Sequence, residues 1–174
     1  PAKWRDTAPK SIKGPGGNDV CSFEGNEIPN IGLNAVAGRP PEDYDMNVTS
    51  YSQIRKGTYD IHERVRDMNV NGVLGSMCFP SFPRFCGQTF YEGADKELGL
   101  LCVKAYNDWM IDEWAGAAPG RFIPMVLIPL WDPKLAAAEV ERTAGMGARA
   151  IAFSENQSPL GLPSITAAGR YWEP

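Results

Sequence analysis

A loop that combines aromatic rings with a cation carries the clearest chemical signal in this sequence. Its candidate substrate-binding residues are Phe79, Ser81, Phe82 and Arg84. An arginine can hold a carboxylate through two parallel hydrogen bonds, and the phenylalanines would exclude water from a ring-shaped ligand. The alternative is that the rings plug the mouth of a barrel or a subunit interface while Arg84 caps the loop. These residues predict a binding site for a small carboxylated compound, and the alternative remains open.

Two further groups of residues follow apolar runs and could contribute to the same chemistry. Glu155 is the catalytic candidate, because a carboxylate at this place could act as a general base. Its neighbours Ser154 and Asn156 are candidate substrate-binding residues. An equally weighted interpretation is that Glu155 caps the next turn. Trp131 is a candidate pocket-lining residue, whereas Asp132, which precedes a proline, is expected to cap a helix.

The sequence offers few ligands for a metal ion. Its one histidine, His62, lies near an expected helix start, where a structural or surface role is favoured. The four cysteines contain no Cys-x-x-Cys pair, and their spacing favours reduced thiols in the cytoplasm. No residue of the chain is assigned as a metal ligand.

A unit repeated three times is expected to position these residues. In each repeat a charged helix precedes a short apolar strand, which ends in polar or proline-rich residues; the expected strands span residues 72–79, 121–128 and 148–153. Strands buried on both faces lose the alternating pattern, so these runs indicate a parallel sheet covered by helices. Ligands bind at the carboxyl ends of such strands. The candidate loops are therefore expected at one edge of the sheet.

Three helices are expected, over residues 60–72, 95–114 and 132–147. The apolar stripe of the middle helix is expected from Leu98, Leu101, Cys102, Ala105, Trp109 and Ile111. The order of elements fits an α/β fold, either an open doubly wound sheet or part of a (β/α)8 TIM barrel.

The first 56 residues lack sustained periodicity. Residues 20–23 and 27–31 predict a short hairpin around residues 24–26. We expect residues 1–56 to be an irregular excursion packed on a second domain, residues 57–174, which holds the helix and strand repeats.

Charge and hydropathy exclude two classes of partner. The net charge is −4 and the pI is about 5.1, with no basic run, which argues against nucleic acid. No apolar run approaches the roughly 20 residues of a membrane span. A small molecule is the expected partner.

Six segments occur in an order that matches a known family: residues 61–73, 76–83, 105–109, 119–124, 129–133 and 147–156. Together they resemble amidohydrolase-related proteins, in the branch that contains aminocarboxymuconate-semialdehyde decarboxylase and related aromatic-acid decarboxylases and hydrolases. The resemblance implies a (β/α)8 barrel with a divalent metal, zinc, manganese or iron, at the strand ends. It also implies metal ligands from a His-x-His or acid-x-His pair ending strand one, a histidine after strand five and an aspartate at strand eight.

None of those ligand motifs has a counterpart in this chain. The resemblance implies that it holds about strands two to four of the barrel, and the ends at Pro1 and Pro174 also suggest an internal fragment of a longer protein. The expected function is part of a metal-dependent enzyme that hydrolyses or decarboxylates a small carboxylated, possibly aromatic, substrate. The alternative is a non-catalytic binding or assembly subunit that completes a barrel with another chain. A homo-oligomer, or a partner that supplies the missing barrel half, is expected. A nucleotide-binding open sheet is disfavoured, because no glycine-rich turn joins a strand to a helix.

Overall fold

The computed structural model describes residues 2–28, 36–44, 50–169 and 171–173. The chain divides into two compact units, Pro1–Leu74 and Gly75–Pro174. The domain boundary expected after residue 56 remains a prediction.

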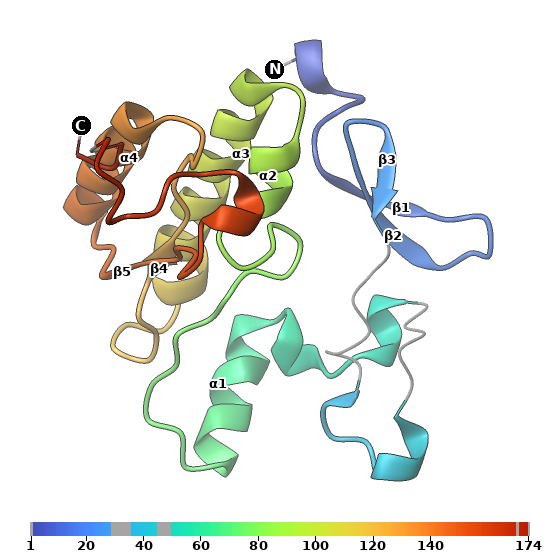
Figure 1. The fold of residues 1–174 in the computed structure, drawn as a ribbon. Coiled ribbons are helices and arrows are strands. Elements are labelled where there is room, and N and C mark those ends of the chain that lie inside the picture. The colour runs from blue at the N-terminus through green and yellow to red at the C-terminus, as the bar shows by residue number, and fades with distance from the viewer. Residues whose placement is uncertain (1, 29–35, 45–49, 170, 174) are drawn as a thin grey trace. The chain divides into compact units, whose positions relative to one another are not determined.

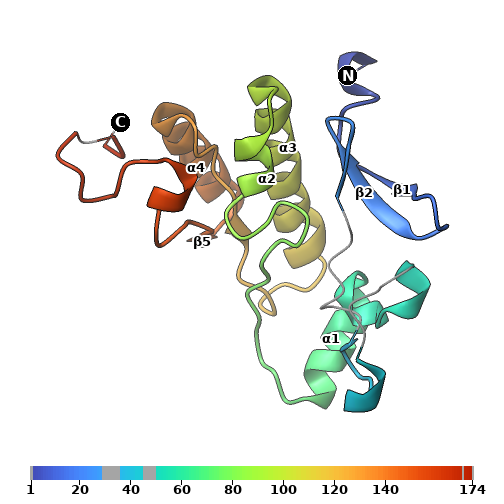
Figure 2. The same cartoon turned by 45° about the vertical axis from the view of Figure 1, so that its right-hand side comes forward.

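The first unit contains a three-stranded antiparallel sheet in the order β1-β2-β3. Figure 1 labels all three strands, and Figure 2 shows β1 and β2 from another side. The strands are β1 (Lys10–Lys13), β2 (Asp19–Phe23) and β3 (Asn26–Ile28). A two-residue turn joins β2 to β3, and both its residues have positive φ, 50° at Glu24 and 78° at Gly25, which suits the twist of a tight hairpin. The predicted hairpin is confirmed over these residues, but β1 was not expected. Residues 29–31 of the expected second strand lie outside the described residues.

Helix α1 (Ile61–Val70) also belongs to the first unit. The carboxylate of Asp60 accepts hydrogen bonds from the backbone N–H groups of His62 and Glu63, at 2.9 and 3.1 Å, and so caps the helix. Gly72, with a φ of 66°, follows the end of the helix. The predicted helix is confirmed at both ends. Single turns of 3-10 helix complete this unit: Ala2–Trp4, Pro41–Asp43, Tyr51–Gln53 and Lys56–Thr58.

The second unit contains a two-stranded parallel sheet and one isolated parallel bridge. Strands β4 (Met125–Val126) and β5 (Ala150–Ile151) pair in parallel, and a single parallel bridge joins Ser76 to Phe122. The three expected strands therefore run in parallel, but their regular pairing is shorter than expected. Residues 72–79 contribute only the bridge. In the middle run, Pro124 interrupts the ladder because it has no backbone N–H to donate. The α/β class is confirmed; a barrel remains a prediction.

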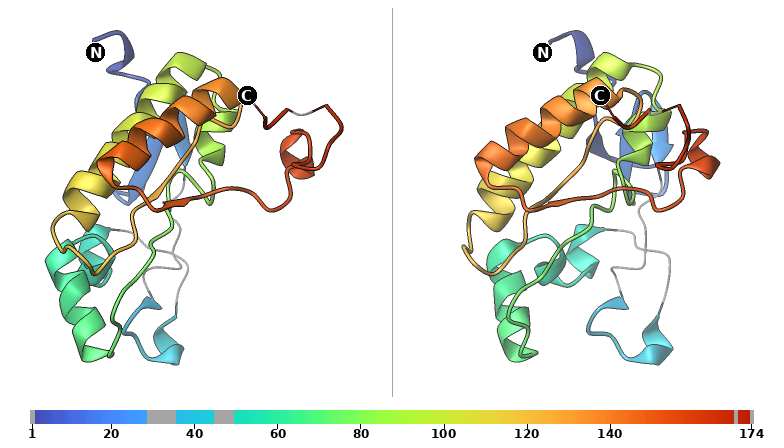
Figure 3. Two further views of the ribbon diagram at one scale, coloured as in Figure 1. Left: turned by 90° about the vertical axis from the view of Figure 1, so that its left-hand side faces the viewer. Right: turned by 60° about the vertical axis from the view of Figure 1, so that its left-hand side comes forward.

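Helices cover this ladder (Figure 3). They are α2 (Gln88–Glu92), α3 (Lys96–Asp108) with a π-helical continuation over Trp109–Ala115, and α4 (Pro133–Met146); a 3-10 turn follows at Ser158–Leu160. Asp95 caps α3 and Asp132 caps α4, each accepting two backbone N–H groups in the first turn. The expected helices over 95–114 and from 132 are confirmed, whereas α2 was not expected.

The buried stripe of α3 differs from the expected one. Leu98, Val103 and Asn107 are buried, whereas Leu101 and Trp109 are 39% and 38% exposed. Apolar residues alone do not determine which face of α3 is buried, because the polar side chain of Asn107 lies on the buried face and bonds to the backbone of Leu127. Among the described residues, no helix is long and apolar enough to cross a membrane.

Candidate functional site

Loops from all three parallel segments meet at the carboxyl edge of the ladder. Cys86, from the first loop, shares a buried cluster with Ile128 and Leu130, which follow β4. The hydroxyl of Tyr91 donates to the backbone oxygen of Leu160, beyond β5, at 2.6 Å. The structure thus brings together the loops in which the sequence placed the candidate residues.

The aromatic loop has an exposed part and an anchored part. Phe79 and Phe85 are 49% and 69% exposed, and their ring centroids lie 5.0 Å apart. Phe82 instead packs edge-on against the buried Phe90, with centroids 6.0 Å apart, while its carbonyl accepts the Thr89 hydroxyl at 2.8 Å. The loop therefore presents Phe79 and Phe85 outward and uses Phe82 to hold itself to α2.

Arg84 is half exposed and already has an acidic neighbour. Its Nη1 donates to both carboxylate oxygens of Glu92, at 3.0 and 3.2 Å. The backbone at Arg84 has a φ of 61°, which is uncommon for a residue with a side chain. The backbone oxygen of the exposed Ser81 accepts the Arg84 N–H at 3.1 Å, which closes the turn that ends at Arg84. The sequence predicted the cation but not its pairing with Glu92.

Trp131 lies against α3 rather than in the aromatic loop. A Cβ on Gly99 of α3 would stand 3.3 Å from the outer edge of the Trp131 ring, so the glycine makes room for it. The Lys96 ammonium lies 5.4 Å from the centroid of that ring and 5.3 Å from that of Tyr91. Lys96 also donates to the backbone oxygens of Tyr91 and Gly93.

The three residues after β5 form a local turn. The Ser154 hydroxyl donates to the Asn156 backbone oxygen at 2.7 Å, and the Asn156 side chain accepts the Ser158 N–H at 3.2 Å. The buried Gln157 side chain donates to the Ser154 backbone oxygen. Glu155 is exposed, and its side chain makes no hydrogen bond or ion pair with any described residue. Ser154 and Asn156 therefore hold the turn that displays Glu155.

Direct contacts do not join the candidate residues into one constellation. Within the described ranges, Arg84, Trp131 and Glu155 share no hydrogen bond, ion pair or ring contact. The roles assigned to these residues remain predictions.

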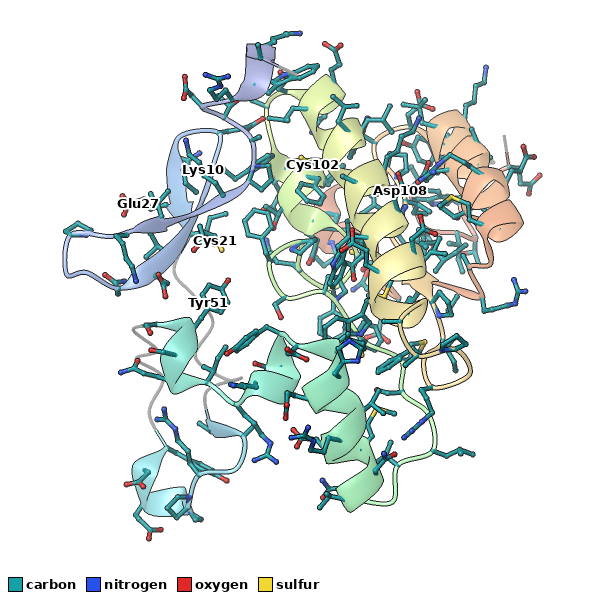
Figure 4. All side chains as sticks on the ribbon, turned by 180° about the vertical axis from the view of Figure 1, so that it is seen from behind. Lys10, Cys21, Glu27, Tyr51, Cys102 and Asp108 are labelled. Carbon is teal, nitrogen blue, oxygen red and sulfur yellow. The ribbon has the colours of Figure 1, made fainter. Side chains whose placement is uncertain are left out.

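A buried polar network that was not predicted holds the helices to β4. The side chain of Asn107, in α3, donates to the Leu127 backbone oxygen at 2.9 Å and accepts the Leu127 N–H at 2.8 Å. The same Asn107 amide donates to Glu139 of α4 at 2.8 Å, and Glu139 accepts two bonds from Arg142. Arg142 also reaches Asp108, which Figure 4 labels on α3, at 2.7 Å.

The carboxylates of Glu139 and Asp108 stabilise the charged form of Arg142. Hydrogen bonds from its guanidinium to Glu139, and then to Asp108, raise the pKa of Arg142, so it stays charged. The sequence signal that could have revealed this network is Asn107, a polar residue among the apolar residues of α3. The network ties α3 and α4 to the strand that leads into the site, so its role is structural.

The described residues do not fit a divalent metal site. They contain no group of three or more His, Cys, Asp or Glu side chains placed to hold an ion. His62 is exposed on α1, and its backbone N–H is used in the helix cap. No chemical step is therefore assigned to a metal held by these residues.

The parallel ladder, its helical cover and the loops at its carboxyl edge define an α/β protein with a candidate enzyme site. The protein-family comparison matches the amidohydrolase family over residues 43–169, more than half of the 174 residues. The chain therefore belongs to the amidohydrolase family, whose members commonly use divalent metal ions. No curated protein matches the chain.

Proposed function

We propose that this chain supplies about strands two to four of a (β/α)8 barrel in a metal-dependent hydrolase or decarboxylase of the amidohydrolase family. The family match supports hydrolase-like chemistry. The parallel sense of β4 and β5 and the parallel bridge at Ser76 are consistent with successive barrel strands. The zinc, manganese or iron ion of the complete enzyme would be held by residues outside those described.

The substrate we propose is a small carboxylated, possibly aromatic, compound. The observation that carries this choice is Arg84, a half-exposed cation beside the exposed Phe79–Phe85 pair at the carboxyl edge of the ladder. In the proposal Arg84 binds the carboxylate, while Phe79, Phe82 and Trp131 exclude water around the ring. Ser81, Ser154 and Asn156 contribute hydrogen bonds at the rim.

Glu155 is the proposed general base. It is exposed and uncommitted to any described partner, so its carboxylate can accept a proton from water or a substrate hydroxyl. Replacing Glu155 by Gln keeps its size and removes the base. Such a loss typically reduces turnover by about 10²-fold or more. The matched control is Glu113→Gln, an exposed carboxylate in the π-helical segment.

The test is turnover of arenecarboxylates by the protein in its native assembly, as a homo-oligomer or with the partner that completes the barrel. Activity should disappear with a chelator and return when zinc, manganese or iron is added. Full activity after thorough demetallation would count against the proposal. A cooperatively folded complex that binds carboxylates without turning them over would instead favour a non-catalytic binding or assembly subunit. A cytoplasmic location remains part of the proposal.

A further inference from the structure

The segment that follows the β5 turn lies against the apolar cluster at the carboxyl edge of the ladder. We call its residues 158–169 and 171–173 the strap, which Figure 1 draws in red. The cluster consists of Cys86, Ile128, Leu130 and Ala136. Three side chains of the strap pack against it, from Leu160, Leu162 and Trp172. The strap is therefore part of the cover over the cluster to which Cys86, 1% exposed, belongs.

Trp172 is the largest of the three anchors of the strap. Its ring lies edge-on to that of Phe153, with centroids 5.1 Å apart and an interplanar angle of 87°. Its indole N–H donates to the backbone oxygen of Pro163 at 2.8 Å. The first contact ties the strap to the residues that follow β5, and the second folds the strap onto itself. A further hydrogen bond, from the Tyr91 hydroxyl of α2 to the backbone oxygen of Leu160, holds its first turn at 2.6 Å.

The remainder of the strap adds little to its attachment. None of its described residues is buried, and its regular structure is the single 3-10 turn Ser158–Leu160. The backbone N–H groups of Leu160, Leu162 and Ala167 bond to carbonyl groups close by in the sequence. A segment with few buried apolar contacts and an exposed backbone opens at a lower free energy than the unit on which it lies. The strap is therefore the part of this edge that should open first.

We propose that the strap is a gate on the carboxyl edge: it unfolds locally, with Trp172 as its main anchor, and exposes Cys86 while the ladder and its helices stay folded. Cys86 belongs to the loop that carries Arg84, and Glu155 lies in the turn just before the strap. Opening of the gate therefore changes access to the edge that holds both candidate residues. This consequence for catalysis rests on the proposed function, whereas the opening itself requires no turnover.

The test is alkylation of Cys86 by iodoacetamide in the full chain, in its native assembly, followed by mass spectrometry of the peptide that contains it. Cys102, a partly exposed thiol on α3, is the internal reference for the reagent. Wild-type Cys86 should react slowly, through local unfolding of the strap. Its rate should hardly change at urea concentrations below the unfolding transition, because opening of the strap exposes little surface.

Two variants should open the gate without altering Cys86 or its loop. Trp172→Ala removes the main anchor and should raise the Cys86 alkylation rate about tenfold or more. Tyr91→Phe removes the hydrogen bond to Leu160 and should raise the rate about two- to tenfold. The matched controls are Trp109→Ala, at a 38% exposed ring of the π-helical segment, and Tyr59→Phe, at a 45% exposed ring of the first unit. Both controls should leave the rate at low urea unchanged.

Three results would overturn the gate: equal Cys86 rates in Trp172→Ala and wild type, an equal increase in Trp109→Ala, or a rate that follows the full urea dependence of global unfolding from the lowest urea concentration. The last result would mean that Cys86 is reached only when the whole unit unfolds. The proposed function fails separately. The predicted alkylation pattern, in a protein whose native assembly turns over no carboxylate, would support the gate and count against the enzyme.

Discussion

Replacing Asn107 by Ala should destabilise the second unit more than any loss of one exposed contact would. Leu127 is 0% exposed, and the Asn107 amide pairs with both its backbone N–H and its carbonyl. Alanine leaves both groups buried without these partners, and each such group costs about 1–3 kcal/mol. The expected loss in the free energy of unfolding is therefore about 2–6 kcal/mol. Domains are typically stable by about 5–15 kcal/mol, so the loss is a large share of the total.

Urea unfolding followed by tryptophan fluorescence and circular dichroism measures this loss. The matched control is Glu141→Ala, an exposed position on α4 that should change stability by less than about 0.5 kcal/mol. Asn107→Asp keeps the acceptor for Leu127 but faces the Glu139 carboxylate, so it should be at least as destabilising. A loss in the free energy of unfolding below about 1 kcal/mol for Asn107→Ala, with an unchanged urea dependence, would contradict this reasoning. It would mean that the hydrogen bonds from Asn107 to Leu127 do not hold α3 to the end of β4.

Three further predictions concern other parts of the chain. Gly57→Ala should lower the free energy of unfolding in urea by about 1–3 kcal/mol, because the new Cβ would stand 2.3 Å from Asp67 Oδ2. At Gly145 a Cβ meets nothing within 4 Å, so Gly145→Ala should stabilise α4 by about 0.4–1 kcal/mol. Equal effects of the two substitutions would contradict this geometry. The hydrogen bond from Arg55 holds the pKa of Asp67 below its ordinary 3.8, so this pair stabilises the fold above pH 3.8 and the contribution is lost as pH falls below that value. Asp67→Asn should therefore flatten the dependence of the free energy of unfolding on pH below pH 4. An unaltered pH dependence would mean that the Arg55–Asp67 pair does not stabilise the fold. Burial raises the pKa of the Cys86 thiol, so alkylation followed by mass spectrometry should label Cys86 only on unfolding; rapid labelling of the native protein would disprove its burial.

Local signals in the sequence predicted the helices well. Asp60, Asp95 and Asp132 were placed at helix starts, and each accepts two backbone N–H groups in the first turn. A capping residue acts within three positions of itself, so its effect can be predicted without knowing the rest of the fold. The parallel sense of the strand segments was predictable for a similar reason, since a helix between two strands returns the chain to the same end.

Contacts between distant residues were not predictable. The partner of Asn107 lies 20 residues away at Leu127, and apolar spacing alone suggested a different buried stripe for α3. The pairing of Arg84 with Glu92 was not predicted, nor was the positive φ at Arg84, which residue preferences disfavour. The short pairing of residues 72–79 was also missed, because an apolar run shows burial and not the partners of its backbone.

If this chain is part of a metal-dependent enzyme acting on a carboxylated substrate, as we propose, turnover of that substrate must depend on bound metal. The measurement is the rate of arenecarboxylate hydrolysis or decarboxylation by the native assembly before chelation, after it, and after zinc, manganese or iron is restored. We expect turnover to be lost and recovered in step with bound metal, and to fall further in Arg84→Lys. Turnover that survives complete demetallation, or that is indifferent to Arg84, would contradict it.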